Sequence, residues 1–431
     1  MTGACDYDVV IAGGGMVGSS LALLLQRLAS PDGQALNVLV VESVAQPSAT
    51  IQNTSPSFDG RSTALSYGSR VIYEQLGLWS RLSEHATAIE HIHVSQRGAF
   101  ASALLHADEM HWPALGYVLE NSGLGEVLLS ALANSAVELA CPATITQAQP
   151  QQGGMLLTLQ EAEKQRQIRT QLLVVADGAG SQLRQHLGIQ HRSHSYQQSA
   201  VVANVSFEKT HQHIAYERFT EQGPMALLPL ADQHRAALVW TQTAEQAQHL
   251  CSCVPSEFLN RLQQRFGHRL GQFTAVGERL QYPLQLIASE EQLRSHVVVM
   301  GNAAHALHPV AGQGFNLALR DCARLSEIVL SAKAQHQNIG ALAALKPYQQ
   351  AQQFDQQKTI LFSDKVGAMF AHGAKPLSLL RNIGLSAVDM LPSLKHSFVR
   401  HAAGQHYGAA LGLLAHNDQL TGDKAIGVEH G

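Results

Sequence analysis

The chain has 431 residues, of which 45% are hydrophobic and 14% are charged, and its formal net charge at pH 7 is −4. The apolar content excludes a disordered chain, and the near balance of charges excludes the basic footprint of a nucleic-acid-binding protein. The charged fraction lies well below the roughly 25% of ordinary soluble domains, which suggests that a partner or a membrane face covers part of the surface.

The cysteines form an odd and sparse set, which indicates free thiols in a reducing compartment rather than a disulfide framework. Cys251 and Cys253 are separated by one residue, but no further ligand stands nearby at a spacing that suits a metal, so no metal site is expected. The N-terminus lacks the basic region of a signal peptide, and no run reaches the roughly 18 apolar residues of a membrane-spanning helix. We therefore expect a cytoplasmic protein whose contact with the inner membrane is at most peripheral.

The first part of the chain predicts a strand–helix–strand unit. Residues 7–12 and 37–42 are short apolar segments typical of buried strands, and residues 19–28 are rich in Leu and Ala, as in a helix. Further apolar strands are predicted at 172–176 and 297–300, and each ends abruptly in a turn of small residues. This pattern predicts a parallel sheet with ligand-binding turns at the strand ends.

The middle of the chain predicts a second sheet. Residues 199–240 alternate in short segments around a Gly223-Pro224 turn, which favours antiparallel strands. The bulky side chains of this segment are expected in the core more than on a ligand; they are Tyr216, Phe219, Leu227, Leu228 and Trp240. From Phe315 onward the chain is predicted to be helical, and residues 417–431 form a polar tail.

A glycine fingerprint lies between the first strand and the first helix. At the spacing of Gly13, Gly15 and Gly18, the first glycine allows a tight turn, the second admits a pyrophosphate, and the third lets helix and strand pack closely. Glu42 ends the second strand, 24 residues after Gly18 (42 − 18 = 24), where a carboxylate accepts hydrogen bonds from a ribose. The unit predicts a dinucleotide site, which at this point fits either NAD or FAD.

Two later segments favour FAD. Asp177-Gly178-Ala179 follows the strand at 172–176, and Gly301-Asn302-Ala303-Ala304 follows the strand at 297–300. Beyond the latter, Gly312-Gln313-Gly314 opens a helix, whose backbone N–H groups and positive end suit the anionic ring edge of a reduced flavin. A simple NAD dehydrogenase needs no such second site.

Together these segments resemble the group A flavoprotein monooxygenases of the para-hydroxybenzoate hydroxylase type. Phe58-Asp59-Gly60-Arg61 and His308-Pro309-x-Ala311-Gly312-Gln313-Gly314-x-Asn316 narrow the resemblance to the hydroxylases of ubiquinone biosynthesis. His93-Val94-Ser95-x-Arg97-Gly98 and Glu217-Arg218-Phe219-Thr220 are most similar to the 2-octaprenyl-6-methoxyphenol hydroxylase type. The resemblance covers about residues 7–410.

The resemblance implies an α/β fold, with a Rossmann-like FAD-binding domain, an inserted antiparallel β-sheet substrate domain and a C-terminal helical region. The implied division places residues 1–90, 111–190 and 285–345 in the FAD-binding domain, 91–110 and 191–284 in the substrate domain, 346–416 in the helical region and 417–431 in a flexible tail. In the implied reaction, NAD(P)H reduces FAD, O2 forms a flavin C4a-hydroperoxide, and the ring of a polyprenylated phenol such as 2-polyprenyl-6-methoxyphenol is hydroxylated.

The resemblance also implies roles for individual residues. The residues expected to bind the cofactor are Gly13, Gly15, Met16, Val17, Gly18, Glu42, Arg61, Asp177, Gly301, Asn302, Gly312, Gln313, Gly314 and Asn316. Pro309 is expected to shape the oxygen-activating pocket, and His308 to contact flavin or substrate. Asn302 departs from the aspartate of the broader family, but its amide oxygen can still accept a hydrogen bond from a ribitol hydroxyl.

Several alternatives stay open. A sister hydroxylase would act at another ring position in the same pathway, another enzyme would hydroxylate a small soluble phenol, and a flavin-binding scaffold would have little turnover. Residues 375–400 combine an apolar helical pattern with Lys375, Arg381, Lys395 and Arg400 against a single acidic residue. Such a segment is typical of a helix on a membrane or in a biosynthetic complex, and equally of a helix packed on the catalytic domain.

Overall fold

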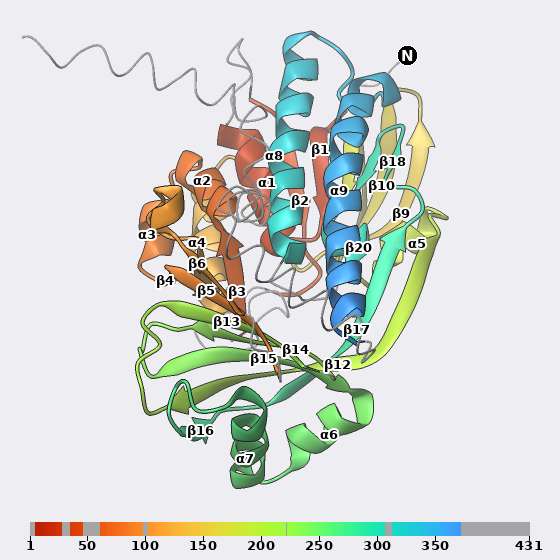
Figure 1. Cartoon of the computed structure of the whole chain (residues 1–431). Coiled ribbons are helices and arrows are strands. Elements are labelled where there is room, and N and C mark those ends of the chain that lie inside the picture. The colour runs from red at the N-terminus through yellow and green to blue at the C-terminus, as the bar shows by residue number, and fades with distance from the viewer. Residues whose placement is uncertain are drawn as a thin grey trace, which may run out of the picture.

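Two large sheets and a small one form the frame of the molecule (Figure 1). The computed structural model describes residues 5–27, 35–45, 61–97, 102–220, 222–306 and 313–371, with the side chains of the last helix described as far as residue 357 except at position 354. Within these ranges no helix is both long and apolar enough to cross a membrane.

The first large sheet has eight strands, of which five run parallel in the order β19-β11-β1-β2-β8. Its strands are β1 (Tyr7–Ala12), β2 (Val38–Val41), β8 (Glu138–Ala140), β9 (Thr144–Gln151), β10 (Gly154–Glu161), β11 (Lys164–Val175), β18 (Leu293–Arg294) and β19 (Val297–Val299). The central strands are apolar on both faces because side chains pack against each face of the sheet. In register, Ala12 pairs with Val41 and Val175, and Val175 pairs with Val299. The turns that follow these four strands therefore meet at one edge.

Helices cover this sheet and fix that edge. They are α1 (Met16–Arg27), α4 (Asn121–Ala133), α5 (Gln182–His186), α8 (Gln313–Ala334) and α9 (Leu342–Ala371). α1 contacts α4 and α8, and α8 lies beside α9, as Figure 1 shows. Leu21 and Leu24 of α1 are fully buried in the core, and burying each leucine contributes about 1.5–3 kcal/mol. This packing holds the N-termini of α1 and α8 at the carboxyl edge of the sheet.

The second large sheet has nine strands in the order β20-β17-β12-β15-β14-β13-β5-β6, with β16 beside β12. The strands are β5 (His91–Gln96), β6 (Ser102–His106), β12 (His191–Phe207), β13 (Ile214–Thr220), β14 (Gly223–Pro229), β15 (Arg235–Thr243), β16 (Phe273–Val276), β17 (Leu280–Ser289) and β20 (His305–Ala306). The helices α6 (Ala244–Ser252) and α7 (Pro255–Phe266) cover its outer face (Figure 1). Trp240 packs on Phe258 there. The inner face is turned toward the first sheet.

One pairing in this sheet differs from the antiparallel arrangement that the sequence predicts. β13 and β5 run parallel, with Glu217 opposite Val94. β5 enters from an earlier part of the chain, far from β13 in sequence, so no hairpin turn forces the two strands to be antiparallel. The other pairs of this sheet are antiparallel.

A small sheet joins the two large ones. It consists of β3 (Ser62–Ser66), β7 (Gly116–Glu120) and β4 (Ala86–Ile89), paired in that order. The remaining elements of the described ranges are α2 (Tyr67–Gln75), α3 (Trp79–Ser83) and the short 3-10 helices η1 (Asp108–Met110) and η2 (Gly301–Ala303). The side chain of Ser66 caps α2 by accepting a hydrogen bond from the Ser69 amide.

The predicted bounds of the first two strands agree with β1 and β2 to within a few residues. The first helix starts at Met16 rather than at residue 19, directly after the glycine turn. The predicted domain boundary at 284/285 falls inside β17, because this long strand pairs with both β12 and β20. The boundary at 345/346 falls inside α9, and residues 372–416 of the predicted helical region, like the tail, lie outside the described residues.

Candidate active site

A cavity of about 640 Å³ lies at the carboxyl edge of the parallel sheet. Gly13 and Gly15, Glu42, and Asp177 line it from the ends of β1, β2 and β11 respectively. Met16 and Val17 at the start of α1 and Asn302 in η2 line it as well. Except for Gly18, the residues that the sequence predicts for a dinucleotide therefore converge on one cavity, since they follow strands that end in register.

Two glycines, one in the turn after β1 and one in the first turn of α1, stand where a side chain would clash. Gly13 has a φ of +105°, and a Cβ added there would lie 2.5 Å from the carbonyl oxygen of Ala176. A Cβ on Gly18 would lie 1.9 Å from the carbonyl oxygen of Gly13, so Gly18 permits the close packing of α1 on β1. Gly18 itself is buried and does not line the cavity, which gives it a packing role.

Glu42 points back toward the glycine turn. Its Oε2 accepts a 2.6 Å hydrogen bond from the Gly14 amide, and its Oε1 accepts a 2.8 Å bond from the Val44 amide. These bonds hold the carboxylate in the wall of the cavity, next to the N-terminus of α1. Charge-assisted bonds of this kind are the stronger class of hydrogen bond, so they fix its direction.

Arg184 joins two of the strand-end turns. It is 1% exposed, and its guanidinium donates to the carbonyl of Ala303 at 2.6 Å and to that of Ala179 at 3.3 Å. These bonds tie the Asp177-Gly178 turn to the turn after β19. Asp177 faces the cavity but is surrounded by protein, and desolvation raises the pKa of its carboxyl, opposed by hydrogen bonds from Ser181 and the backbone.

A second cavity, of about 690 Å³, lies between the inner face of the second sheet and the end of the first cavity. Asn302, Gly314 and Phe315 line both cavities, so these residues mark where the two meet. Gly301 precedes them with a φ of +59°, and a Cβ added there would lie 3.2 Å from Cγ2 of Val17. The N-terminus of α8 lies at this junction, where its amide groups favour a negative partner. We call the first space the nucleotide cavity and the second the ring cavity.

The ring cavity has mostly apolar walls. Aliphatic side chains from both the small sheet and the second sheet line it, including Ile89, Ile92, Val202, Leu228, Val239, Leu284 and Ile287. Arg61 lines it too, with its guanidinium 4.8 Å over the ring of Tyr282. Such walls accept a flat apolar group and leave few polar contacts to orient it.

Asn316 does not line either cavity with its side chain. It is 1% exposed, and its Oδ1 accepts hydrogen bonds from the Ser66 amide at 2.8 Å and the Ser69 hydroxyl at 2.7 Å. Its Nδ2 donates to the carbonyl of Ala64 at 2.8 Å. The amide is thus occupied by protein partners and anchors the start of α8 to β3 and α2, which differs from the direct cofactor contact that the sequence predicts.

A buried polar cluster lies beneath α8. Arg320 pairs with Asp355 of α9 at 2.9 Å, and His305 lies 3.9 Å from Asp321. Burial lowers the pKa of His305 to about 4 and raises that of Asp321 well above its usual value. His305 is therefore neutral at pH 7, and its contact with Asp321 is not an ion pair. The cluster fixes α8 and α9 against the turn after β19.

Several expected site residues lie outside the described part of the chain. These are His308, Pro309 and Gly312, and the side chain of Gln313, although Gln313 begins α8. Two residues of the site were not expected there. Arg184 follows the Asp177-Gly178 turn in the sequence, but one of its partner carbonyls, that of Ala303, belongs to a segment 119 residues further along the chain. Glu217 lines the ring cavity, and the alternation of β13 alone does not tell which of its faces meets a ligand.

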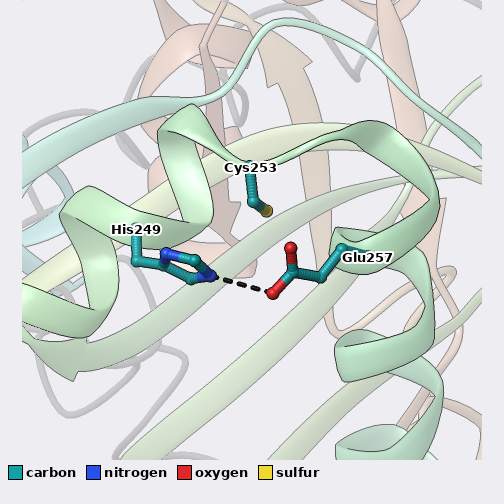
Figure 2. A group of neighbouring side chains, drawn as sticks. All are labelled: His249, Cys253 and Glu257. Atoms are coloured by element: carbon teal, nitrogen blue, oxygen red, sulfur yellow. Dashed lines mark hydrogen bonds and ion pairs between the residues drawn. The ribbon is translucent and has the colours of Figure 1, made fainter.

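A further group of possible metal ligands lies on the outer side of the second sheet (Figure 2). The ligand atoms of His249, Cys253 and Glu257 lie within 4.8 Å of one another, so the expectation that no ligands stand near Cys253 was wrong. The three residues stand four positions apart in the sequence. They extend across the turn between α6 and α7, however, so the sequence alone did not indicate that their side chains lie together. Arg261 binds Glu257 at 2.8 Å, and Arg279 Nη1 lies 3.6 Å from the Cys253 sulfur. Two cations at the ligand atoms oppose a metal ion.

The paired cavities fit FAD. The glycine turn leaves no room for a Cβ, the N-termini of α1 and α8 face the cavities, and a carboxylate stands at the end of β2. These features suit a pyrophosphate, a ring with negative charge and a ribose respectively. The apolar ring cavity at the far end suits an aromatic group beside the flavin ring.

Sequence comparisons agree with this geometry. The FAD binding domain family matches residues 6–340. Ubiquinone hydroxylase UbiL of Rhodospirillum rubrum is 33% identical over 407 residues, which cover 94% of this chain and 91% of that protein. The 3-demethoxyubiquinol 3-hydroxylase of Escherichia coli is 30% identical over 398 residues, which cover 92% of this chain and 98% of that protein.

Solved structures share the fold. The p-nitrophenol 4-monooxygenase PnpA of Pseudomonas putida matches with a TM-score of 0.74 at 16% identity, over 92% of this chain and 98% of that one. PqsL of Pseudomonas aeruginosa, in complex with 2-aminobenzoylacetate, matches with a TM-score of 0.70 at 22% identity, over 88% of this chain and 99% of that one. The chain therefore belongs to the FAD-dependent aromatic monooxygenases, in the family that includes the hydroxylases of ubiquinone biosynthesis.

Proposed function

We propose that this protein hydroxylates the ring of a polyprenylated phenol, 2-polyprenyl-6-methoxyphenol, on the route to ubiquinone. The apolar ring cavity of about 690 Å³, which meets the nucleotide cavity at Asn302, Gly314 and Phe315, is the observation that carries the proposal. Such a cavity would accept an aromatic substrate beside the flavin ring, against mostly apolar walls. The related ubiquinone hydroxylases support the choice of a phenolic or quinol-type ring with O2 as the second substrate.

We propose that different residues of the cavities would bind different parts of FAD. Gly13, Gly15 and the start of α1 hold the pyrophosphate, and Glu42 holds the ribose of the ADP half. Asp177 and Asn302 would hold the central part of the cofactor, and Gly314 with the N-terminus of α8 would hold the pyrimidine edge of the flavin ring. The roles proposed for His308, Pro309 and Gly312 rest on the sequence motif alone.

The protein's part in the reaction is to bind, orient and exclude water. Bound FAD supplies electrons taken from NAD(P)H, the reductant typical of this family, and the chemistry that activates O2. The helix N-terminus at Gly314 stabilises negative charge on the ring edge, and the positive charge of Arg61 lies in the same cavity. The aliphatic walls keep water from the reacting atoms and hold the aromatic ring in place.

Deletion of the gene followed by mass spectrometry of the accumulating quinone precursors tests the proposed substrate. Accumulation of the prenylated methoxyphenol is the expected result. A prenylphenol without the methoxy group, or a demethoxyquinone, would assign the protein to another ring position of the same pathway, which the Escherichia coli relative makes the leading alternative. Unchanged ubiquinone in a strain that has no second hydroxylase for the step would contradict the pathway.

Two other functions make different predictions. A hydroxylase of small soluble phenols would turn over short phenols as well as prenylated ones in vitro, and its deletion would leave ubiquinone unchanged. A flavin-binding scaffold would still complement the deletion after Gly15→Val or Asp177→Ala, provided the variant folds. We expect both variants to fail in complementation, because both residues line the nucleotide cavity.

We further propose that residues 375–400, which lie outside the described part of the chain, contact the membrane or a biosynthetic complex and guide the isoprenoid tail inward. The support is the sequence, with Lys375, Arg381, Lys395 and Arg400 around an apolar helical pattern. Reversing the charge at Arg381 and Lys395 should reduce co-sedimentation with membranes. Unchanged sedimentation would favour a helix that packs on the catalytic domain.

A further inference from the structure

One carboxyl group lies in the apolar wall of the ring cavity. Glu217 stands in the middle of β13, opposite Val94 of β5 and Ala226 of β14, so its cross-strand neighbours are apolar. Ala215 and Ala226 line the cavity beside it. Within the described ranges no hydrogen bond or ion pair reaches the Glu217 carboxyl. A polar group in such a place costs free energy unless a partner arrives, and the open side of Glu217 is the cavity.

Among the described residues, the charged groups near the cavity contact partners other than Glu217. Arg61 lies over the ring of Tyr282, and Arg218 of β13 donates to the carbonyl of Arg265 in α7, on the other face of the sheet. His93 of β5 also lies on that outer side, against Tyr216. Burial is the cause that raises the pKa of Glu217 to about 8, although the side chain is partly accessible through the cavity.

The helix α9 offers a structural alternative. It contacts β13 and β14, and its second half carries Lys358, Asp364 and Lys365 in the sequence. An ion pair between Glu217 and this helix would make the carboxyl a structural group that fixes α9 on the sheet. Thermal stability and the pH profile of catalysis separate that role from a role toward substrate.

We propose that the Glu217 carboxylate accepts the proton of the ring hydroxyl of the substrate. This inference rests on the proposed function, since it requires a phenolic ring in the ring cavity. In the step, the O–H bond of the phenol breaks, its electron pair stays on the ring oxygen, and the proton bonds to a carboxylate oxygen of Glu217. No oxidant or reductant takes part. After the ring carbon has been hydroxylated and has released its own proton, the Glu217 carboxylic acid returns the first proton to the ring oxygen.

The chemistry of the site favours this step. A ring with phenolate character is richer in electrons, and its attack on an electrophilic oxygen is faster. An ordinary glutamate, with a pKa of about 4.3, is a poor base for a phenol of pKa about 10. With its pKa raised to about 8, Glu217 is a closer match, which makes the transfer less uphill.

The test compares the FAD-loaded wild type with Glu217→Gln, which keeps the shape of the side chain but cannot take up a proton. Glu245→Gln, at an exposed position in the first turn of α6, is the matched control for loss of a carboxylate. Product formation, NAD(P)H oxidation, FAD content and melting temperature are measured from pH 6 to pH 9 with a prenylated phenol. Binding of the phenol and of its methyl ether, which has no proton to give, is compared by flavin absorbance changes.

We expect Glu217→Gln to lower kcat for hydroxylation by about 10²- to 10⁴-fold, the usual size of a general-base effect, with full FAD content and an unreduced melting temperature. In the wild type kcat should fall as the pH drops below about 8, and this limb should be absent in the variant. Affinity for the methyl ether should change less than twofold, and Glu245→Gln should match the wild type.

Other outcomes overturn the inference in distinguishable ways. An active wild type with an equally active Glu217→Gln variant, or with the same pH limb in the variant, would refute the base and leave the proposed function intact. A fall in melting temperature with an unchanged pH profile would assign Glu217 to an ion pair with α9. A wild type that hydroxylates no prenylated phenol would overturn the proposed function, and the base with it.

Discussion

Substituting Gly18 by alanine should weaken FAD binding by displacing α1 from β1. The added Cβ would lie 1.9 Å from the carbonyl oxygen of Gly13 and 3.2 Å from Cγ2 of Ile11. Since real Cβ atoms essentially never approach a neighbour closer than 3.0 Å, the helix or the turn must move by at least 1.1 Å (3.0 − 1.9 = 1.1). The atom it meets is backbone and the position is buried, so no flexible side chain can give way.

Overpacking of this kind costs about 1–3 kcal/mol. Because 1.4 kcal/mol corresponds to a factor of ten in an equilibrium constant, the Kd for FAD should rise by about tenfold to hundredfold. Titration of the apoprotein with FAD, followed by quenching of flavin fluorescence, measures this change. Gly277→Ala is the control, because its added Cβ would lie 3.6 Å from its nearest neighbour, an ordinary contact. Wild-type affinity and stability in Gly18→Ala would refute the packing role of this glycine.

Three further predictions follow from buried or clustered groups. Arg184→Met should lower the free energy of unfolding by about 3 kcal/mol in urea denaturation, because buried carbonyls of two strand-end turns lose their charged donor; a loss below about 1 kcal/mol would contradict this clamp. The pKa of Glu217 is raised by folding from 4.5 to about 8, so its stabilising contribution is complete below pH 4.5 and is lost as the pH rises to about 8. Glu217→Gln should therefore gain in melting temperature over the wild type between pH 5 and pH 9, and parallel pH curves would show that the shift is absent. Cys253→Ser should leave activity unchanged. Elemental analysis of the purified wild type should find no zinc, because Arg261 and Arg279 lie against the Glu257 and Cys253 side chains that would bind it. Stoichiometric zinc would overturn this prediction.

The nucleotide cavity was predictable from sequence for a specific reason. Gly13, Glu42, Asp177 and Gly301 each follow an apolar strand, and parallel strands that end in register bring such residues to one edge whatever the loops between them. The glycine spacing adds a local steric requirement that the structure explains at Gly18. Local sequence and one topological rule were therefore enough for this half of the site.

The ring cavity was less predictable because its walls come from contacts between distant segments. Whether Glu217 faces the cavity or the core depends on which side of β13 is covered by α7, and no local pattern settles this. Asn316 belongs to a motif typical of cofactor binding, yet its side-chain amide is hydrogen-bonded to residues some 250 positions away in the sequence. Gln352 lies in a Gln-rich stretch of the sequence, yet it is 2% exposed because α9 packs on α8.

Turnover of a prenylated methoxyphenol by the purified, FAD-loaded protein under ¹⁸O2 tests the central claim most directly. The proposed function predicts NAD(P)H oxidation coupled to a ring-hydroxylated product in which one oxygen atom comes from O2. Oxygen taken from water would contradict a monooxygenase. NAD(P)H oxidation that yields hydrogen peroxide but no hydroxylated prenylphenol, with the substrate shown to bind, would contradict the assignment of the ring cavity.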